Sequence, residues 1–182
     1  FSFNVNKKFK FDNFKIKSTV NLNELIISQK DLRLKEYFPS FVEEIKLQKH
    51  KVIIDYHKKR LDIKGNGNIL LEEKLDSLSY KLIKNNDNFS FNSKINIKNN
   101  SLLLEFLDYK KKEGVSSLVL LNGTFQKDNR LKLDLVSLKE KDNQILIKGL
   151  DLNKNLKIED IKDFKINYKN NKKIFNKINL QK

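Results

Sequence analysis

The sequence predicts a mainly β protein whose strands form one long, curled antiparallel β-sheet, a half-open β-groove. Three observations predict this fold class: apolar and polar residues alternate along most of the chain, clusters of Asn and Asp interrupt the alternation, and alanine is absent. Residues two apart lie on one face of a strand, so each alternating segment has an apolar and a polar face. Alanine is the best helix former, and its absence favours strands.

The alternating segments follow one another along the chain. Asn and Asp tolerate left-handed backbone conformations, so clusters such as 85–88, 127–129 and 141–143 are typical of tight turns. The pattern predicts a meander of roughly ten to thirteen strands. The alternating apolar residues are Phe1, Phe3 and Val5; Phe14, Ile16, Val20 and Leu22; Val52, Ile54 and Tyr56; Leu61 and Ile63; Leu78, Tyr80 and Leu82; Phe89, Phe91, Ile95 and Ile97; Val119, Leu121 and Phe125; Leu131, Leu133 and Leu135; Ile145 and Ile147; and Phe164, Ile166 and Tyr168.

Two stretches depart from the alternation. Residues 30–48 contain the single proline, Pro39, and predict one short helix or irregular crossing over one end of the sheet. In this stretch Ser40 could cap a helical turn running through Phe41, Val42 and Ile45. Residues 107–117, with three consecutive lysines and a glycine, predict a loop.

Two glycine-containing stretches resemble hairpin turns, but the alternation continues across them. Around Gly65-Asn66-Gly67-Asn68 the apolar positions run on from Ile63 to Ile69, and Asn122-Gly123 lies inside a similar pattern. Glycine within a strand pattern marks a bulge or bend. Because bulges bend a strand and increase its twist, we expect these glycines to curl the sheet.

The charge is strongly positive and comes almost entirely from lysine. The formal net charge is +15, and arginine occurs only three times. Arginine carries the planar fork that recognises phosphates and bases, so a lysine-rich solvated face is favoured over nucleic-acid binding. An anionic membrane surface is a further candidate partner. The absence of cysteine excludes disulfides and thiolate metal sites.

No pattern points to catalysis, a metal or a cofactor. The two histidines, His50 and His57, are seven residues apart and would face opposite sides of one strand. The acidic pairs at 43–44 and 72–73 are adjacent in sequence, so their side chains would point apart on a strand. We therefore expect neither an enzyme nor a metalloprotein.

The apolar faces of so many strands must be covered by a second sheet, by barrel closure, or by a bound apolar molecule. A curled sheet with an apolar concave side would bind acyl chains, and a sandwich packed against itself remains an equal alternative on these patterns alone. The predicted lipid-binding residues are Phe89, Phe91, Ile95, Ile97, Val119, Leu121, Phe125, Leu131, Leu133, Leu135, Ile145 and Ile147.

Residues 52–168 resemble the repetitive β region of AsmA-like proteins, in particular the YhdP and TamB group. The resemblance is carried by the I-x-G-x-G strand at 63–67, the L-x-G-x-F strand at 121–125 and the D-N-x-I-x-I-K-G-L-x-L run at 142–152. These are strand rhythms rather than signature residues, and the resemblance carries over no catalytic residue.

The resemblance implies a protein of the bacterial envelope that moves phospholipids between the inner and outer membranes along an apolar groove. It implies a periplasmic location and attachment to the inner membrane by a segment outside these residues. We expect residues 1–182 to form a single β-groove segment of a longer protein, monomeric, with phospholipid acyl chains and membranes or envelope proteins as partners. The alternative function is a structural or protein-interaction β domain of the envelope with a self-packed core.

Overall fold

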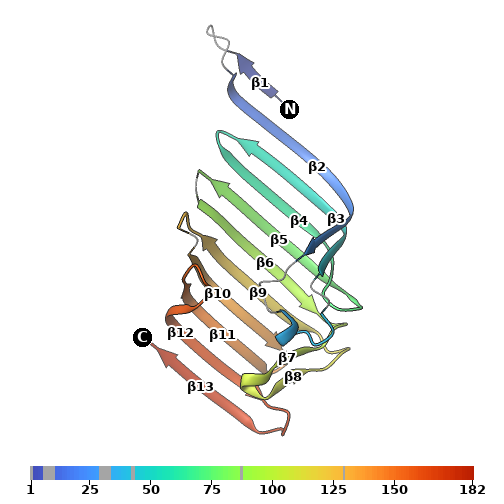
Figure 1. Cartoon of the computed structure of the whole chain (residues 1–182), viewed down its shortest axis with the longest axis vertical. Helices are drawn as coiled ribbons and strands as arrows, with labels where there is room; N and C mark the ends of the chain where they lie inside the picture. The colour runs from blue at the N-terminus through green and yellow to red at the C-terminus, as the bar shows by residue number, and fades with distance from the viewer. Residues whose placement is uncertain (1, 6–10, 29–33, 42–43, 87, 129) are drawn as a thin grey trace.

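The computed structural model describes residues 2–5, 11–28, 34–41, 44–86, 88–128 and 130–182. Eleven strands form one antiparallel sheet in the order β1-β2-β3-β4-β5-β6-β9-β10-β11-β12-β13, and β7 and β8 form a separate hairpin (Figure 1). The predicted mainly β fold with a long antiparallel sheet is confirmed. The sheet is open, with β1 and β13 at its two edges.

Each strand of the sheet pairs with the next one along the chain, except that β6 pairs with β9. The strands of the sheet are β1 (Ser2–Val5), β2 (Phe11–Ser28), β3 (Glu44–His57), β4 (Arg60–Leu70), β5 (Leu75–Asn85), β6 (Asn88–Ile97), β9 (Ser117–Phe125), β10 (Leu131–Glu140), β11 (Asn143–Leu152), β12 (Ile158–Lys169) and β13 (Phe175–Gln181).

The meander gives the sheet two different ends. The turns after β3, β5, β9 and β11 follow one another along the left-hand side in Figure 1, and we call this side the open end. The connections after β4, β6, β10 and β12 lie on the opposite side, which we call the covered end. Segments at the covered end cross the inner face of the sheet, whereas the turns at the open end are short.

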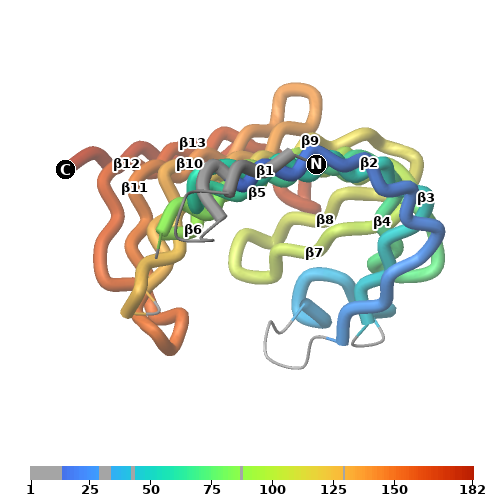
Figure 2. The backbone as a smooth tube through the Cα atoms, turned by 90° about the horizontal axis from the view of Figure 1, so that it is seen from above, coloured from blue at the N-terminus to red at the C-terminus, as the bar shows by residue number. Residues whose placement is uncertain are grey.

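The cover, which we call the strap, consists of residues 34–41 and 102–111. It contains two 3-10 helices, η1 (Leu34–Glu36) and η2 (Glu105–Leu107), and the strands β7 (Leu102–Leu104) and β8 (Tyr109–Lys111). The amide of Leu103 donates to the carbonyl of Tyr37 at 2.9 Å, which joins the two parts. Figure 2 shows the strap on the inside of the arch that the sheet forms.

The strap corrects two expectations and confirms one. The helical turn is η1 at 34–36, before Ser40, while Ile45 lies in β3, and Val42 lies outside the described residues. The predicted loop at 107–117 contains strand β8, because its residues pair with β7. The expectation of a short helix or crossing over one end of the sheet is confirmed, since Phe38 and Phe41 are buried in the core.

The strand pairing is irregular at two places in the curled sheet, between β3 and β4 and between β9 and β10. Between β3 and β4 the register shifts between Gln48 and Lys51, opposite the glycine stretch of β4, and Lys49 has a positive φ of 53°. Between β9 and β10 it shifts between Leu133 and Leu135, opposite Gly123. An extra residue in one strand bends that strand. The prediction that both glycine stretches lie within strands is therefore confirmed.

The buried core lies between the strap and the covered end of the sheet. From the strap come Phe38, Phe41, Leu102, Leu107 and Tyr109; from the sheet and its turns come Leu47, Ile69, Leu71, Ile97, Leu138, Ile145, Ile166 and Tyr168. The hydroxyl of Tyr168 donates to the carbonyl of Leu107 at 2.7 Å, and the amide of Asn171 donates to the carbonyl of Asp108 at 2.9 Å. These bonds attach the far end of the strap to β12 and the turn after it.

Candidate functional site

The inner face of the sheet carries a series of apolar rows that run across the strands. Directly paired residues of antiparallel strands lie on the same face, so the pairing registers define each row. Starting from the open end, we name them the tip row, the middle row, the deep row and the covered row. The first three lie on the open half of the face, and the covered row packs into the core beneath the strap.

The middle row is the most continuous apolar feature of the open half. It crosses nine strands, and its apolar side chains are half-buried except for Leu150, which is buried between Leu133 and Ile161. Its residues, from β2 to β12, are Ser18, Ile54, Ile63, Leu82, Phe91, Gly123, Leu133, Leu150 and Ile161.

The deep row lies between the middle row and the strap. It consists of Val20, Val52, Gly65, Tyr80, Ser93, Leu121, Val136, Ile147, Phe164 and Leu180. Its only polar side chains are a tyrosine and a serine. The apolar surface therefore continues from the middle row to the edge of the covered core, against which Ile147 and Phe164 pack.

The tip row adjoins the turns of the open end and contains the one charged side chain in these three rows. Lys84 pairs with Leu61 on one side and Phe89 on the other and is exposed. The row consists of Ile16, Tyr56, Leu61, Lys84, Phe89, Phe125, Leu131 and Leu152. An amine at this position stands at the mouth of an otherwise apolar surface.

The covered row shows what the strap does to the remaining part of the face. Ile97 beside this row is only 2% exposed, and Ile166 within it is fully buried. The row consists of Leu78, Ile95, Val119, Leu138, Ile145 and Ile166, and it ends at the β13 edge in Ile178, which is 42% exposed. The strap therefore seals one half of the inner face and leaves the other half uncovered by the described residues.

The predicted lipid-binding residues divide among these regions. Phe89, Phe91, Leu121, Phe125, Leu131, Leu133 and Ile147 lie on the open half, whereas Ile95, Ile97, Val119 and Ile145 belong to the covered region. The alternation identified the apolar face correctly for these strands. It could not separate the open part from the covered part, because the strap comes from other segments of the chain.

Leu135 does not share the face of Leu131 and Leu133, which corrects the grouping expected from alternation. It pairs with Asn122 and Lys148, whereas the next residue, Val136, pairs with Leu121 and Ile147. The register shift between Leu133 and Leu135 reverses the alternation along β10. Leu135 therefore lies on the outer face.

A histidine and a tyrosine form the floor of the groove near the strap. The rings of His50 and Tyr80 stack with their centroids 5.7 Å apart, and the ring nitrogen Nε2 of His50 lies 2.8 Å from the carbonyl of Asn68. His50 is 1% exposed, and its second ring nitrogen, Nδ1, has no hydrogen-bond partner. A lone histidine without an acid or a second ligand favours a packing role over acid–base or metal chemistry.

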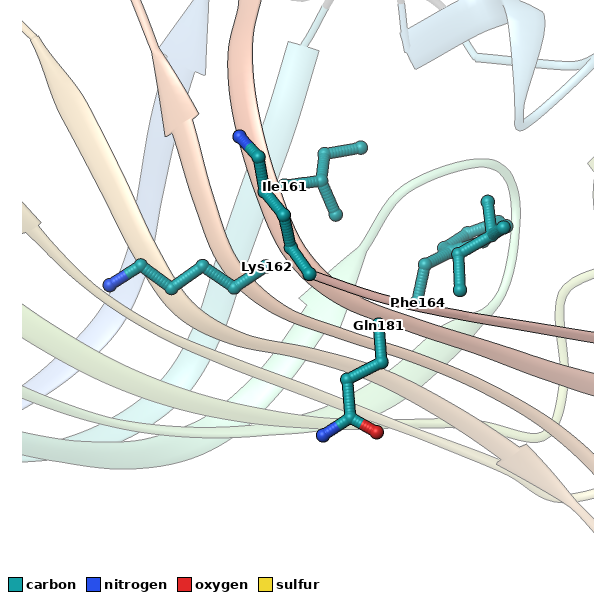
Figure 3. Close-up of a pocket in the computed structure, with 6 residues that line it drawn as sticks. Ile161, Lys162, Phe164 and Gln181 are labelled. Carbon is teal, nitrogen blue, oxygen red and sulfur yellow. The ribbon is translucent and has the colours of Figure 1, made fainter.

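A pocket lies at the β13 edge of the sheet, where side chains of β12 and β13 from both faces line it. Figure 3 shows Ile161 and Phe164 on the inner side of the bend in β12, with Lys162 and Gln181 pointing the other way. The pocket has a volume of about 340 Å³ and is lined by Ile161, Lys162, Phe164, Leu180, Gln181 and Lys182. Its apolar lining continues the middle and deep rows to the edge of the sheet.

Sequence reasoning missed about half of the open face. Ile54, Ile63 and Leu82 were recognised as strand residues but not as part of the site, and Leu150 and Ile161 were not singled out. The signal that connects them is the pairing register, which places them in one row with Phe91 and Leu133. Register across several strands depends on bulges and turn geometry, which a single strand pattern does not specify.

The described residues contain no group of His, Asp and Glu that could hold a metal ion, and no helix among them is long and apolar enough to cross a membrane. Comparison with known proteins returned no matching family model, no matching curated protein and no matching solved structure.

Proposed function

We propose that the open half of the groove binds the acyl chains of lipids and that the chain is a lipid-binding or lipid-conducting segment. The observation that carries the proposal is the middle row, an apolar path across nine strands that is half-buried and uncovered by the described residues. An apolar surface of this extent in a monomer marks a site for an apolar partner.

The dimensions favour a path over a pocket for one small molecule. Neighbouring strands lie about 4.8 Å apart, so a row across nine strands is roughly 40 Å long. An acyl chain lying against it would gain about 0.8 kcal/mol for each methylene it buries. The rows contain no charged side chain except Lys84 at the mouth, so a chain could change position along the groove without losing specific polar contacts.

The resemblance to AsmA-like proteins supports the same proposal and adds the periplasmic setting and phospholipid transport. These additions rest on the strand rhythms at 63–67, 121–125 and 142–152. Transport between membranes would require the groove to continue beyond these residues.

A second candidate function is a structural or protein-interaction domain with a self-packed core. The strap favours it, because thirteen buried apolar side chains already form a core without a ligand. The two functions differ in what occupies the open rows. A bound lipid is expected in the first case, and a partner protein or solvent in the second.

Two leucines on β10 provide a matched test. Leu133 lies in the middle row, and Leu135 lies two residues further on the outer face, and both are half-buried. We expect native mass spectrometry of the purified protein to detect bound phospholipid, Leu133→Asp to remove it, and Leu135→Asp to retain it. Equal retention by both variants, or a heat-stable protein that carries no lipid, would favour the structural function.

A further inference from the structure

We propose that the open end of the sheet is a docking surface for an anionic lipid bilayer. The turns after β3, β5, β9 and β11 form this surface, and they follow one another along the strand ends on one side of the sheet (Figure 1). The inference extends the proposed function, because it places a membrane at the end where the groove is uncovered. Docking itself does not require the groove to bind lipid.

Charge distinguishes the open end from the covered end. The described residues of its four turns contain six basic residues, Lys58, Lys59, Lys127, Arg130, Lys154 and Lys157, and one acid, Asp128. The connections and strap segment of the covered end contain nine lysines but also seven acids. The described turns of the open end therefore carry a higher net positive charge, six bases against one acid, than the segments of the covered end, with nine lysines against seven acids, and Lys84 adds a further amine on the inner face. Clusters of this kind are attracted to anionic lipid headgroups.

The turn after β3 consists of two lysines whose backbone conformation favours other residue types. His57 pairs with Arg60, so the turn consists of Lys58 and Lys59 alone, and both have positive φ, at 47° and 67°. Such a two-residue turn is most easily made by Asn-Gly. Two lysines in left-handed conformations are less favourable than that pair, so the stability of the hairpin does not explain them.

The turn after β11 places an apolar side chain among lysines. Leu156 lies between Lys154 and Lys157 in sequence, has a positive φ of 58° and is 45% exposed. Ile158, two residues further, is 63% exposed. Exposed apolar side chains flanked by lysines suit the boundary between headgroups and acyl chains, where the apolar part inserts and the amines meet phosphates.

Exposed apolar residues also occur at the covered end, where Phe106, Ile174 and Phe175 are the largest. Over the covered end as a whole nine lysines are opposed by seven acids, although Ile174 and Phe175 directly follow Lys172 and Lys173. Charge is therefore the property to vary in the test, and the turn after β12, which contains Lys172 and Lys173, offers a control with the same number of lysines.

The experiment measures co-sedimentation of the whole chain with vesicles of phosphatidylcholine alone or mixed with phosphatidylglycerol. The open-end variant Lys58→Asn/Lys59→Gly removes two charges while installing a favourable turn, so it should fold at least as well as the parent. The control is Lys172→Asn/Lys173→Gly. We expect binding to the anionic vesicles only, weakened by salt, and reduced by the open-end variant about five-fold for each lysine removed, while the control binds nearly as the parent does.

Leu156→Asn tests the apolar contribution, because asparagine tolerates the left-handed conformation. It should lower binding to anionic vesicles and leave the salt dependence unchanged. Equal losses in the two lysine variants would indicate attraction by overall charge and overturn the proposal, as would absence of vesicle binding. Loss of DNA retention without loss of vesicle binding in the open-end variant would assign the surface to nucleic acid instead. Phospholipid retained in native mass spectrometry by a variant that no longer binds vesicles would support docking as an activity of the open-end turns that is separate from lipid binding in the groove.

Discussion

The imidazole of His50 stacks against the phenol ring of Tyr80 directly above two glycines of the neighbouring strand. A Cβ atom at Gly67 would lie 2.4 Å from the His50 ring and 2.8 Å from its Cα, and one at Gly65 would lie 2.2 Å from the Tyr80 ring. The two aromatic rings therefore occupy the volume that side chains at Gly65 and Gly67 would need. The two rings lie at the boundary between the open and covered halves, where the pairing register of β3 and β4 shifts.

Gly67→Ala should destabilise the protein by about 1–3 kcal/mol, because the added methyl group collides with the His50 ring and with its backbone. Gly65→Ala should cost less, since the atoms that it meets are at the end of the Tyr80 side chain, which can rotate. Urea denaturation measures both. Asn66→Ala, between them on the exposed outer face, is the control, and a Gly67→Ala protein as stable as that control would contradict the packing account.

A buried carboxylate of β5 binds the backbone of the connection that leads from β6 to the strap. Asp76, which is 3% exposed, accepts hydrogen bonds from the amides of Lys98, Asn99 and Asn100, two of them at 2.8 Å. Asp76→Ala would leave the buried amide of Asn100 unpaired and release the amides of the exposed residues Lys98 and Asn99 to solvent, so it should lower the free energy of unfolding by about 1–3 kcal/mol.

Hydrogen exchange at those amides gives a local measurement of the same effect. We expect faster exchange at residues 98–100 in Asp76→Ala and unchanged exchange in the middle of β11. Asp142→Ala, in the exposed turn after β10, serves as the control. Uniformly faster exchange across the sheet would mean that Asp76 stabilises the whole fold rather than this turn.

Lys111 predicts a dependence of stability on pH. Its side chain is fully buried, and Nζ donates to the carbonyls of Lys98 and Asn100. Burial lowers the pKa of Lys111 below its ordinary value of 10.5, although nearby carboxylates, Asp76 foremost, act in the opposite direction. Between the lowered pKa of the folded state and 10.5 the unfolded chain binds more protons, so the free energy of unfolding should rise with pH in that window.

Comparison with Lys111→Met isolates this contribution. The difference in the free energy of unfolding between the parent and the variant should increase as the pH is raised toward 10.5, and Lys110→Met, on the exposed neighbouring residue, should leave the pH dependence unchanged. A parallel pH profile in parent and Lys111→Met would show that Lys111 titrates alike in the folded and unfolded states.

The strands and the apolar face were predictable because alternation is a local property of the sequence. Phe89, Phe91, Leu131 and Leu133 were placed on one face from their spacing, and the pairing registers agree. Leu135 was misplaced because a single extra residue in β10 reverses the alternation after it. No residue type marks that bulge within β10, and its visible signal, Gly123, lies on the neighbouring strand.

The strap was only partly predictable for a different reason. Pro39 and its neighbours indicated a crossing, but β7 and β8 are three residues long and show no alternation that distinguishes them from a loop. Lys111 belongs to a run of lysines that is typical of an exposed segment, yet it is buried. Its amine donates hydrogen bonds to two carbonyls and is attracted by the carboxylate of Asp76, which together stabilise the buried charge. Such burial follows from tertiary contacts between residues far apart in sequence.

Gly149 lies in β11 directly before Leu150 of the middle row. It has a positive φ of 59° within β11, and a Cβ atom there would lie 2.7 Å from the Lys162 side chain. Gly114 also has a positive φ, of 79°, but nothing lies within 4 Å of its Cβ position. Alanine at either position incurs the left-handed backbone penalty of about 1–2 kcal/mol, and only Gly149→Ala adds a collision.

Gly149→Ala should therefore be less stable than Gly114→Ala in urea denaturation, by about 1 kcal/mol or more. Because Gly149 precedes Leu150 of the middle row, relief of the collision would displace that leucine, and Gly149→Ala should also retain less phospholipid in native mass spectrometry. Gly114→Ala lies in the connection between β8 and β9 and should retain it fully. Equal stability of the two variants would mean that Lys162 moves aside without cost and that the bend does not depend on the missing side chain at Gly149.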